Sequence, residues 1–203
     1  MAESRTRAPA EAGPVELVLH TACVKAGAYA LAHRVIRALP LAKPFLAPSL
    51  RKNLSGNTPA KIQARLIRDI YRRYGLKPAN WEIAAILAVA DAGTPQLLDG
   101  AAIERRLRRS LGETASRWLM RLAPLAQWAP ELLAEVARTW AIGRYADSVG
   151  RVRKLGSDWL PAPLSKNLKL PASLLWNWSE EAFELALPAL KRLQHAGRRF
   201  KRG

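Results

Sequence analysis

The sequence predicts an all-α protein, built as an antiparallel helical bundle with a C-terminal helical extension. Apolar residues recur at three- and four-residue steps along several segments, and none alternates apolar with polar residues as a half-buried strand does. Cap residues, prolines and glycines bound these segments. We expect a flexible tail at 1–13, a helical bundle domain at 14–150, and a basic connector with a C-terminal helix at 151–203.

The first helix is expected from Pro14 to about Leu39. Pro14 suits the first helical position because its fixed φ matches a helix and its missing N–H would be unpaired there anyway. Prolines from Pro40 to Pro48 then interrupt the chain repeatedly. They leave room for only a short helical piece around 45–53.

The second long helix has the clearest boundaries, with Thr58 as N-cap, Pro59 in the first turn and Gly75 at its end. One side of it is apolar. Four cations fall within about 60° on the opposite side. This stripe is open to two interpretations, an ordinary solvated surface or a face that binds anions. Its members are Lys61, Arg65, Arg68 and Arg72.

Two helices are expected in the middle of the chain. Asn80 can cap a helix that ends near Gly93, and Asp99 can cap the next, which ends before Pro124. The second of these carries adjacent arginine doublets in its first half, which create a strong local positive field. The doublets are Arg105, Arg106, Arg108 and Arg109.

The last third of the chain changes character after Gly150. A helix is expected from Pro130 to about Gly150, followed from Arg151 by a basic segment that prolines prevent from forming one long helix. A final helix is expected over about 172–196, with a bend at Pro188.

Charge is the strongest indication of function. The chain has 33 Lys and Arg against 16 Asp and Glu, a formal net charge of +17. Such an excess favours an anionic partner, which can be a membrane surface, a nucleic acid or an acidic protein. The sequence leaves the oligomeric state open.

The sequence also bears on cellular location. The single cysteine, Cys23, excludes an intramolecular disulfide, and the polar N-terminus lacks the apolar run of a secretory signal. Cytoplasmic location is therefore expected. The longest uncharged run, 170–179, is shorter than the roughly 20 residues of a membrane-spanning helix, so we expect no segment to cross a bilayer unaided.

We find no catalytic signature, and expect neither an enzyme nor a cofactor. His20 and Cys23 form an i, i+3 pair without further ligands at zinc spacing, so no metal site is expected. Cys23 lies among apolar residues and is expected to be a buried, inert thiol. The clustered carboxylates lie in early helical turns, where the helix dipole favours them. These are Glu131, Glu135, Glu180, Glu181 and Glu184.

Two residues depart from the pattern of their helices. Gln63 lies on an apolar face, where an unpaired amide costs about 1–3 kcal/mol, so we expect it to hydrogen-bond to a neighbour. Gly143 lies inside a helix at a cost of about 1 kcal/mol relative to alanine. Close approach of another helix backbone would offset that cost. A packing role is the favoured interpretation of both.

Two motifs carry a resemblance to a known family. An alanine-rich helix is followed by a proline pair and then by a glutamine-bearing helix that ends in Tyr-Gly, and a later helix carries Thr-x-Ala-x-Gly-Arg. The chain resembles, over about residues 20–150, a bacterial helical domain family found in YcjF-type inner-membrane-associated proteins and beside Era-like GTPase domains. The matching residues are Pro40, Pro44, Gln63, Tyr74, Gly75, Thr139, Ala141, Gly143 and Arg144.

The resemblance implies association with the inner membrane and supplies no catalytic residues. The chain departs from the family at 47–50, which lack its acidic residue, and at 123–128, which replace its glycine-rich helix entry. It also lacks the Gly-x-x-x-x-Gly-Lys-Ser/Thr loop that binds nucleotide phosphates.

Two classes of partner follow from the basic residues. At an anionic membrane, cations contact headgroups while aromatic rings enter the interface, and the C-terminal third interleaves both. The alternative for its tryptophans is packing in the core. The residues concerned are Arg153, Lys154, Lys166 and Lys169, with Trp159, Trp176 and Trp178 as interfacial anchors.

The hypothesis is therefore a non-enzymatic scaffold or accessory protein at the cytoplasmic face of the inner membrane, which partners a GTPase or another membrane-linked protein. The alternative is a nonspecific nucleic-acid-binding protein that contacts phosphates through its arginine stripes. We find none of the sequence motifs of base-specific recognition.

Overall fold

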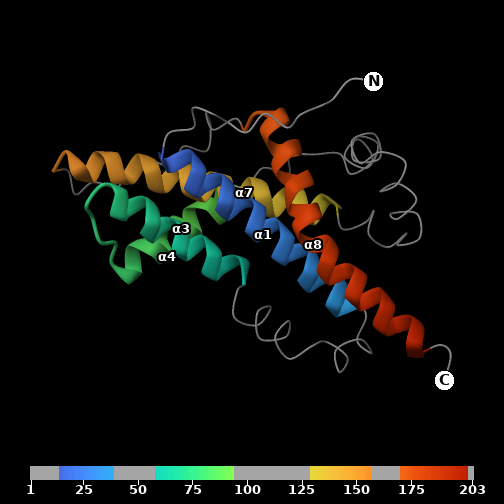
Figure 1. The fold of residues 1–203 in the computed structure, drawn as a ribbon. Coiled ribbons are helices and arrows are strands. Elements are labelled where there is room, and N and C mark those ends of the chain that lie inside the picture. Colours follow the sequence, from blue (N-terminus) through green and yellow to red (C-terminus); the bar gives the residue numbers. More distant parts are fainter. Residues whose placement is uncertain (1–13, 39–57, 94–128, 157–169, 201–203) are drawn as a thin grey trace, which may run out of the picture.

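The computed structural model describes residues 14–38, 58–93, 129–156 and 170–200. These ranges contain α1 (Pro14–Ala38), α3 (Pro59–Arg73), α4 (Asn80–Gly93), α7 (Ala129–Lys154) and α8 (Ala172–Phe200), and no strand (Figure 1). The all-α fold class is confirmed. The tail at 1–13, the helical piece at 45–53 and the helix after Asp99 lie outside the described residues.

Helices α1 and α7 run antiparallel. Near the end of α1, Arg34 Nη2 lies 3.0 Å from Glu131 Oε1 in the first turn of α7. Near the beginning of α1, Glu16 forms an ion pair with Arg144, far along α7. The two pairs therefore occur in opposite order along the two helices, as the bundle prediction requires.

Helix α3, by contrast, runs in the same direction as α7. The Gln63 amide donates to Thr139 Oγ1 at 3.1 Å, and about two to three turns further along both helices the Tyr74 hydroxyl donates to Asp147. The C-terminal ends of α3 and α7 thus lie at one end of the bundle, where α4 begins (Figure 1). We call it the α3/α7 end.

One hydrophobic core joins all five described helices. Burial is deepest where α1, α3 and α7 meet, and α8 packs on α1 with its first half in the same cluster. The predicted C-terminal extension therefore shares the core of the bundle. The residues that α8 contributes are Leu175, Trp178, Ala182, Phe183 and Ala186.

The boundaries of α3 agree with the sequence prediction. The Thr58 side chain accepts a hydrogen bond from the Lys61 N–H at 3.4 Å, as an N-cap does. At the other end Gly75 has a φ of 75°, a left-handed conformation that favours glycine. These two local signals set where the helix begins and ends.

The beginning of α4 differs from the prediction by one residue. Asn80 is the first helical residue, while the Ala79 carbonyl accepts from the Glu82 and Ile83 N–H groups at 3.1 and 3.2 Å. The Glu82 side chain accepts from the Ala79 N–H at 2.7 Å, whereas the Ala79 side chain has no acceptor to offer the Glu82 N–H. This is the glutamate half of a capping box.

Helices α7 and α8 are both longer than predicted. α7 continues beyond Gly150 to Lys154, and Gly156, with a φ of 84°, follows its end. The connector expected from Arg151 thus begins as helix, because no proline occurs before Pro161. α8 extends to Phe200 with Pro188 inside it, and changes direction along its length (Figure 1).

One segment of the described residues is long and apolar enough, by length and composition, to cross a membrane. It is Val15–Arg34 in α1, with a mean hydropathy of 1.2. The expectation that no segment crosses a bilayer unaided stays a prediction, because this finding concerns length and composition alone. The segment is 44% buried inside the bundle, and a helix in a protein core meets the same criteria.

Gly143 lets α1 and α3 approach α7, although side chains rather than a helix backbone fill the space. A Cβ at this position would lie 3.1 Å from Leu66 Cδ2 and closer still to Leu19 Cδ1. Both leucines are almost fully buried. The expected packing role is confirmed, and the expected backbone contact is replaced by two leucine side chains.

We expect Gly143→Ala to lower the free energy of unfolding by up to about 2 kcal/mol, because overpacking costs roughly 1–3 kcal/mol and the gain in helix propensity returns about 1. Urea unfolding measures the loss. In a Leu19→Ala background the same substitution should cost less, since the obstructing side chain is shortened. Equal losses in both backgrounds would contradict this packing.

Candidate anionic-surface binding site

The cationic stripe of α3 lies on the surface. Lys61, Arg65, Arg68 and Arg72 are all exposed, because the opposite side of the helix packs into the core. Arg72 donates to Asp69 Oδ1 at 2.8 Å. The other three form no ion pair within the described residues, so their charges are available to an external anion.

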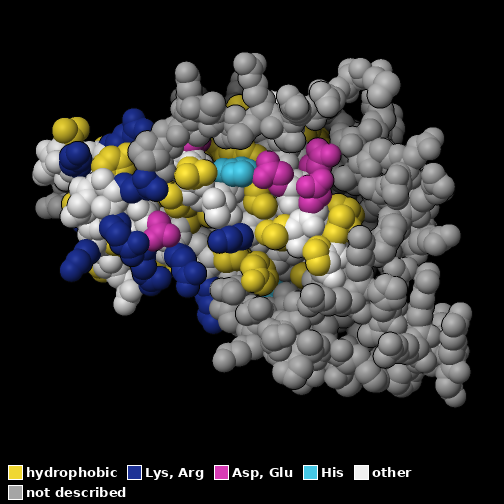
Figure 2. Space-filling model, in the orientation of Figure 1, with side chains coloured by type: hydrophobic (Ala, Val, Ile, Leu, Met, Phe, Trp, Pro, Cys, Tyr) yellow, Lys and Arg dark blue, Asp and Glu magenta, His cyan; other side chains and the backbone are white. Residues whose placement is uncertain are grey.

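Further cations extend the stripe around the α3/α7 end. Arg73, Lys77 and Lys154 are exposed there, and none of the three has an ion pair in the part of the chain that the structure describes. Lys and Arg side chains gather over this end on the face shown in Figure 2. The carbonyl ends of α3 and α7 favour cations at this position.

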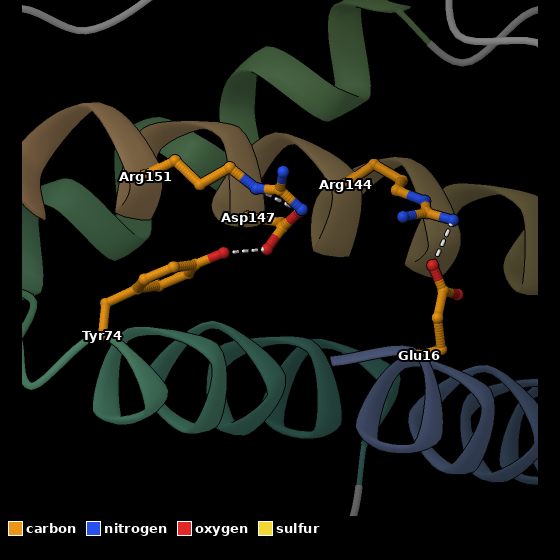
Figure 3. A network of polar contacts seen from close by, with 5 residues as sticks. All are labelled: Glu16, Tyr74, Arg144, Asp147 and Arg151. Carbon is orange, nitrogen blue, oxygen red and sulfur yellow. Dashed lines mark hydrogen bonds and ion pairs between the residues drawn. The ribbon is translucent and has the colours of Figure 1, made fainter. Parts of the chain in front are cut away.

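The acidic side chains of this end are neutralised by internal partners. Asp147 Oδ1 accepts from the Tyr74 hydroxyl, while Oδ2 accepts from Arg151 Nη2 at 2.9 Å and Nε at 3.2 Å (Figure 3). On the same helix Arg144 pairs with Glu16 (Figure 3). These contacts neutralise the carboxylates with cations of the protein itself. The exposed cations of α3 and the α3/α7 end are therefore left without an acidic partner.

Arg153 is part of this internal pairing and is not the surface contact that was expected. Its Nη1 lies 3.0 Å from Glu82 Oε1, and its side chain is only 22% exposed. Glu82 is buried and has no other cation beside it in the described structure, so the pair ties the beginning of α4 to the end of α7. Lys154, the next residue, is exposed as expected.

The expected aromatic anchors do not lie on the surface where the structure describes them. Trp178 is buried in the core, where its ring lies 5.3 Å from that of His20, so its assignment as an interfacial anchor is wrong. Trp176 is half-buried against the same core. The remaining predicted contacts lie outside the described residues: Trp159, Lys166, Lys169, Arg105, Arg106, Arg108 and Arg109.

Sequence reasoning missed the apolar side chains that are exposed at the α3/α7 end. Trp81, in the first turn of α4, is 60% exposed, and Leu155, just after α7, is 86% exposed. Their neighbours Glu82 and Arg153 form an ion pair, which places both at the same end. A helical projection of α4 could have found Trp81, because it lies opposite Ile83 and Ile86.

The residues of the family-like motifs serve the interior. Gln63 is buried and donates to Glu135 Oε1 as well as to Thr139, which confirms that its amide is paired. Arg144 lies over the Trp140 ring at 5.6 Å. The Gln63 hydrogen bonds position α3 against α7 and leave the cationic side of α3 facing outward.

The histidine and cysteine considered for chemistry in α1 are paired and buried, respectively. Burial raises the pKa of the Cys23 thiol, an effect larger than the opposing one of Arg144, so this cysteine is an inert core residue. His20 Nε2 lies 2.7 Å from Glu181 Oε2. Among the described residues no three His, Cys, Asp or Glu side chains are placed to hold a metal ion.

Comparison of the whole chain with known proteins found no matching family, no matching curated protein and no matching solved structure. Function is therefore inferred from the chain's own residues.

Tyr71 in α3 and the partly buried Tyr74 at its end differ in their hydrogen bonding. Tyr74 donates to Asp147, whereas the fully buried Tyr71 hydroxyl has no hydrogen-bond partner in the described structure. Burial, reinforced by the charge of Glu82, raises the pKa of Tyr71 to about 12 from its ordinary 10.0. Between pH 10.0 and about 12 the Tyr71 hydroxyl therefore stays protonated in the folded state, whereas the unfolded state releases this proton.

Phenylalanine substitutions should consequently have different effects at neutral pH. Tyr74→Phe is expected to lower the free energy of unfolding by about 1–2 kcal/mol, because Asp147 loses a buried donor. Tyr71→Phe is expected to leave it unchanged or slightly higher, since the hydroxyl that it removes has no partner. Urea unfolding of both variants measures the difference, and equal losses would contradict it.

The pH dependence supplies a separate check. Stability of the wild type should fall as the pH rises from 10.0 to about 12, because only the unfolded state releases the Tyr71 proton there. Tyr71→Phe should show a shallower fall over the same interval. An unchanged slope in this variant would show that Tyr71 is not the group responsible.

Proposed function

We propose that the protein is a non-enzymatic helical scaffold or accessory protein that binds the anionic cytoplasmic surface of the inner membrane and there partners a GTPase or another membrane-linked protein. One observation carries the proposal. Six exposed cations of α3 and the α3/α7 end have no ion pair among the described residues, while the acidic side chains beside them are neutralised internally. The six are Lys61, Arg65, Arg68, Arg73, Lys77 and Lys154.

The magnitude of the attraction supports a membrane partner. A cation near an anionic bilayer contributes about 1 kcal/mol, so even four simultaneous contacts give useful adhesion. Because exposed charges are screened beyond about 8 Å at physiological ionic strength, that adhesion should weaken with salt. A nucleic acid would satisfy the same cations, and unpaired bases can stack on an exposed tryptophan such as Trp81, but the strand offers no apolar environment for the exposed Leu155.

Charge reversal on α3 tests the proposal. Arg65→Glu/Arg68→Glu should weaken co-sedimentation with phosphatidylglycerol-containing vesicles by about tenfold or more, at roughly 1 kcal/mol per lost cation. Lys25→Glu/Arg37→Glu changes the net charge equally on exposed positions of α1 and should have a smaller effect. Binding should be weak on zwitterionic vesicles.

A gel-shift assay with duplex and single-stranded DNA, run over the same salt series, separates the alternatives. Retention of DNA without binding to anionic vesicles would replace the membrane proposal with nucleic-acid binding. Binding to neither would favour an acidic protein as the partner.

A further inference from the structure

Over its first ten residues, Asn80–Val89, helix α4 has an outer face without charge. The segment Asn80–Val89 is apolar, and its one charged residue, Glu82, is buried. Ile83 and Ile86 face the core, while Trp81 and two alanines of the opposite side are exposed. The exposed positions are Trp81, Ala84 and Ala88, which follow one another at helical spacing.

This pattern is unusual for a helix at a protein surface. A helix on the outside of a water-soluble bundle normally presents charged or polar side chains to water. Here the outer face presents two methyl groups and an indole, and tryptophan is enriched where a membrane meets water. The face therefore suits an environment that is apolar on one side and wet on the other.

Cations surround the beginning of this face. Lys77 precedes α4 in the chain, and Arg73 ends the helix before it. Lys154 and the exposed Leu155 lie at the same end, because the Glu82–Arg153 ion pair holds the end of α7 beside the first turn of α4. An apolar face with a cationic rim matches the order of acyl chains and anionic headgroups in a bilayer.

We infer that α4 lies in the interface of an anionic bilayer, with Trp81, Ala84 and Ala88 toward the acyl chains and Leu155 inserted beside them. This inference rests on the proposed function and assigns the membrane-inserted element, whereas α3 supplies long-range attraction. A second copy of the chain fits the face poorly. Symmetric pairing with the two α4 helices parallel would bring the like-charged rims of Arg73, Lys77 and Lys154 together, and antiparallel pairing would leave each rim without an anionic partner.

Fluorescence quenching tests the depth of Trp81. Vesicles of phosphatidylglycerol brominated on the acyl chains should quench part of the tryptophan emission of the wild-type protein. Trp81→Phe keeps an aromatic ring at the interface but removes this reporter, so a smaller fraction of its emission should be quenched. An equal quenched fraction in both proteins would overturn the inference.

Placing a charge on the face gives an independent test. Ala84→Glu should weaken partition into anionic vesicles about tenfold, because a carboxylate would enter the interface among anionic headgroups. Ala134→Glu is a matched control, since it makes the same change at an exposed helical alanine of α7 far from the α3/α7 end. Circular dichroism checks that both variants are folded.

The outcomes separate this inference from the proposed function. If Ala84→Glu and Ala134→Glu bind anionic vesicles equally well, α4 does not insert, although surface binding through α3 stands. If the wild-type protein does not bind anionic vesicles, both this inference and the proposed function are wrong. If Ala84→Glu instead changes the sedimentation coefficient of the free protein without affecting vesicle binding, a second copy covers α4 and the inference is wrong.

Discussion

The structure depends on the placement of Asp147, a buried carboxylate between two helices that run in the same direction. It accepts from Tyr74 at the end of α3 and from Arg151 one turn further along α7. A buried charge is costly unless it is paired and hydrogen-bonded, so these contacts restrict α3 to one register and one rotation. The hydrogen bond from Gln63 to Thr139 restricts α3 in the same way at an earlier point of both helices. The cationic side of α3 can then face only outward.

The pairing of buried carboxylates with cations also explains why the surface of the α3/α7 end is positively charged. Asp69, Glu82 and Asp147 each have a cationic partner, and two of these three carboxylates are buried. The remaining exposed cations keep their full charge toward solvent. The same ion pairs therefore serve the interior and the surface. Each pair neutralises a carboxylate that would otherwise weaken the attraction of the exposed cations for an external anion.

Local patterns predicted much of this fold. The N-cap Thr58 and the left-handed Gly75 define α3 within a residue, because caps and turns act over short stretches of chain. The pairing of Gln63 was also predictable, since a buried amide requires a partner. The identity of that partner was not, because Thr139 lies 76 positions away and helix packing brings it near. Trp178 and Arg153 were misassigned for the same reason: their sequence neighbours are basic or polar, but their spatial neighbours are His20 and Glu82.

The sequence by itself determined the helical class, the caps of α3 and the separation of its apolar side from its cations. These properties follow from short-range sterics, hydrogen bonding and helical periodicity. Only the tertiary structure decided which charged side chains are neutralised and which aromatic rings are exposed to solvent. The exposure of a side chain depends on which other helix packs against it. Trp81 and Trp178 both occur in helices, yet Trp178 is buried in the core beside His20 of α1, whereas Trp81 is exposed.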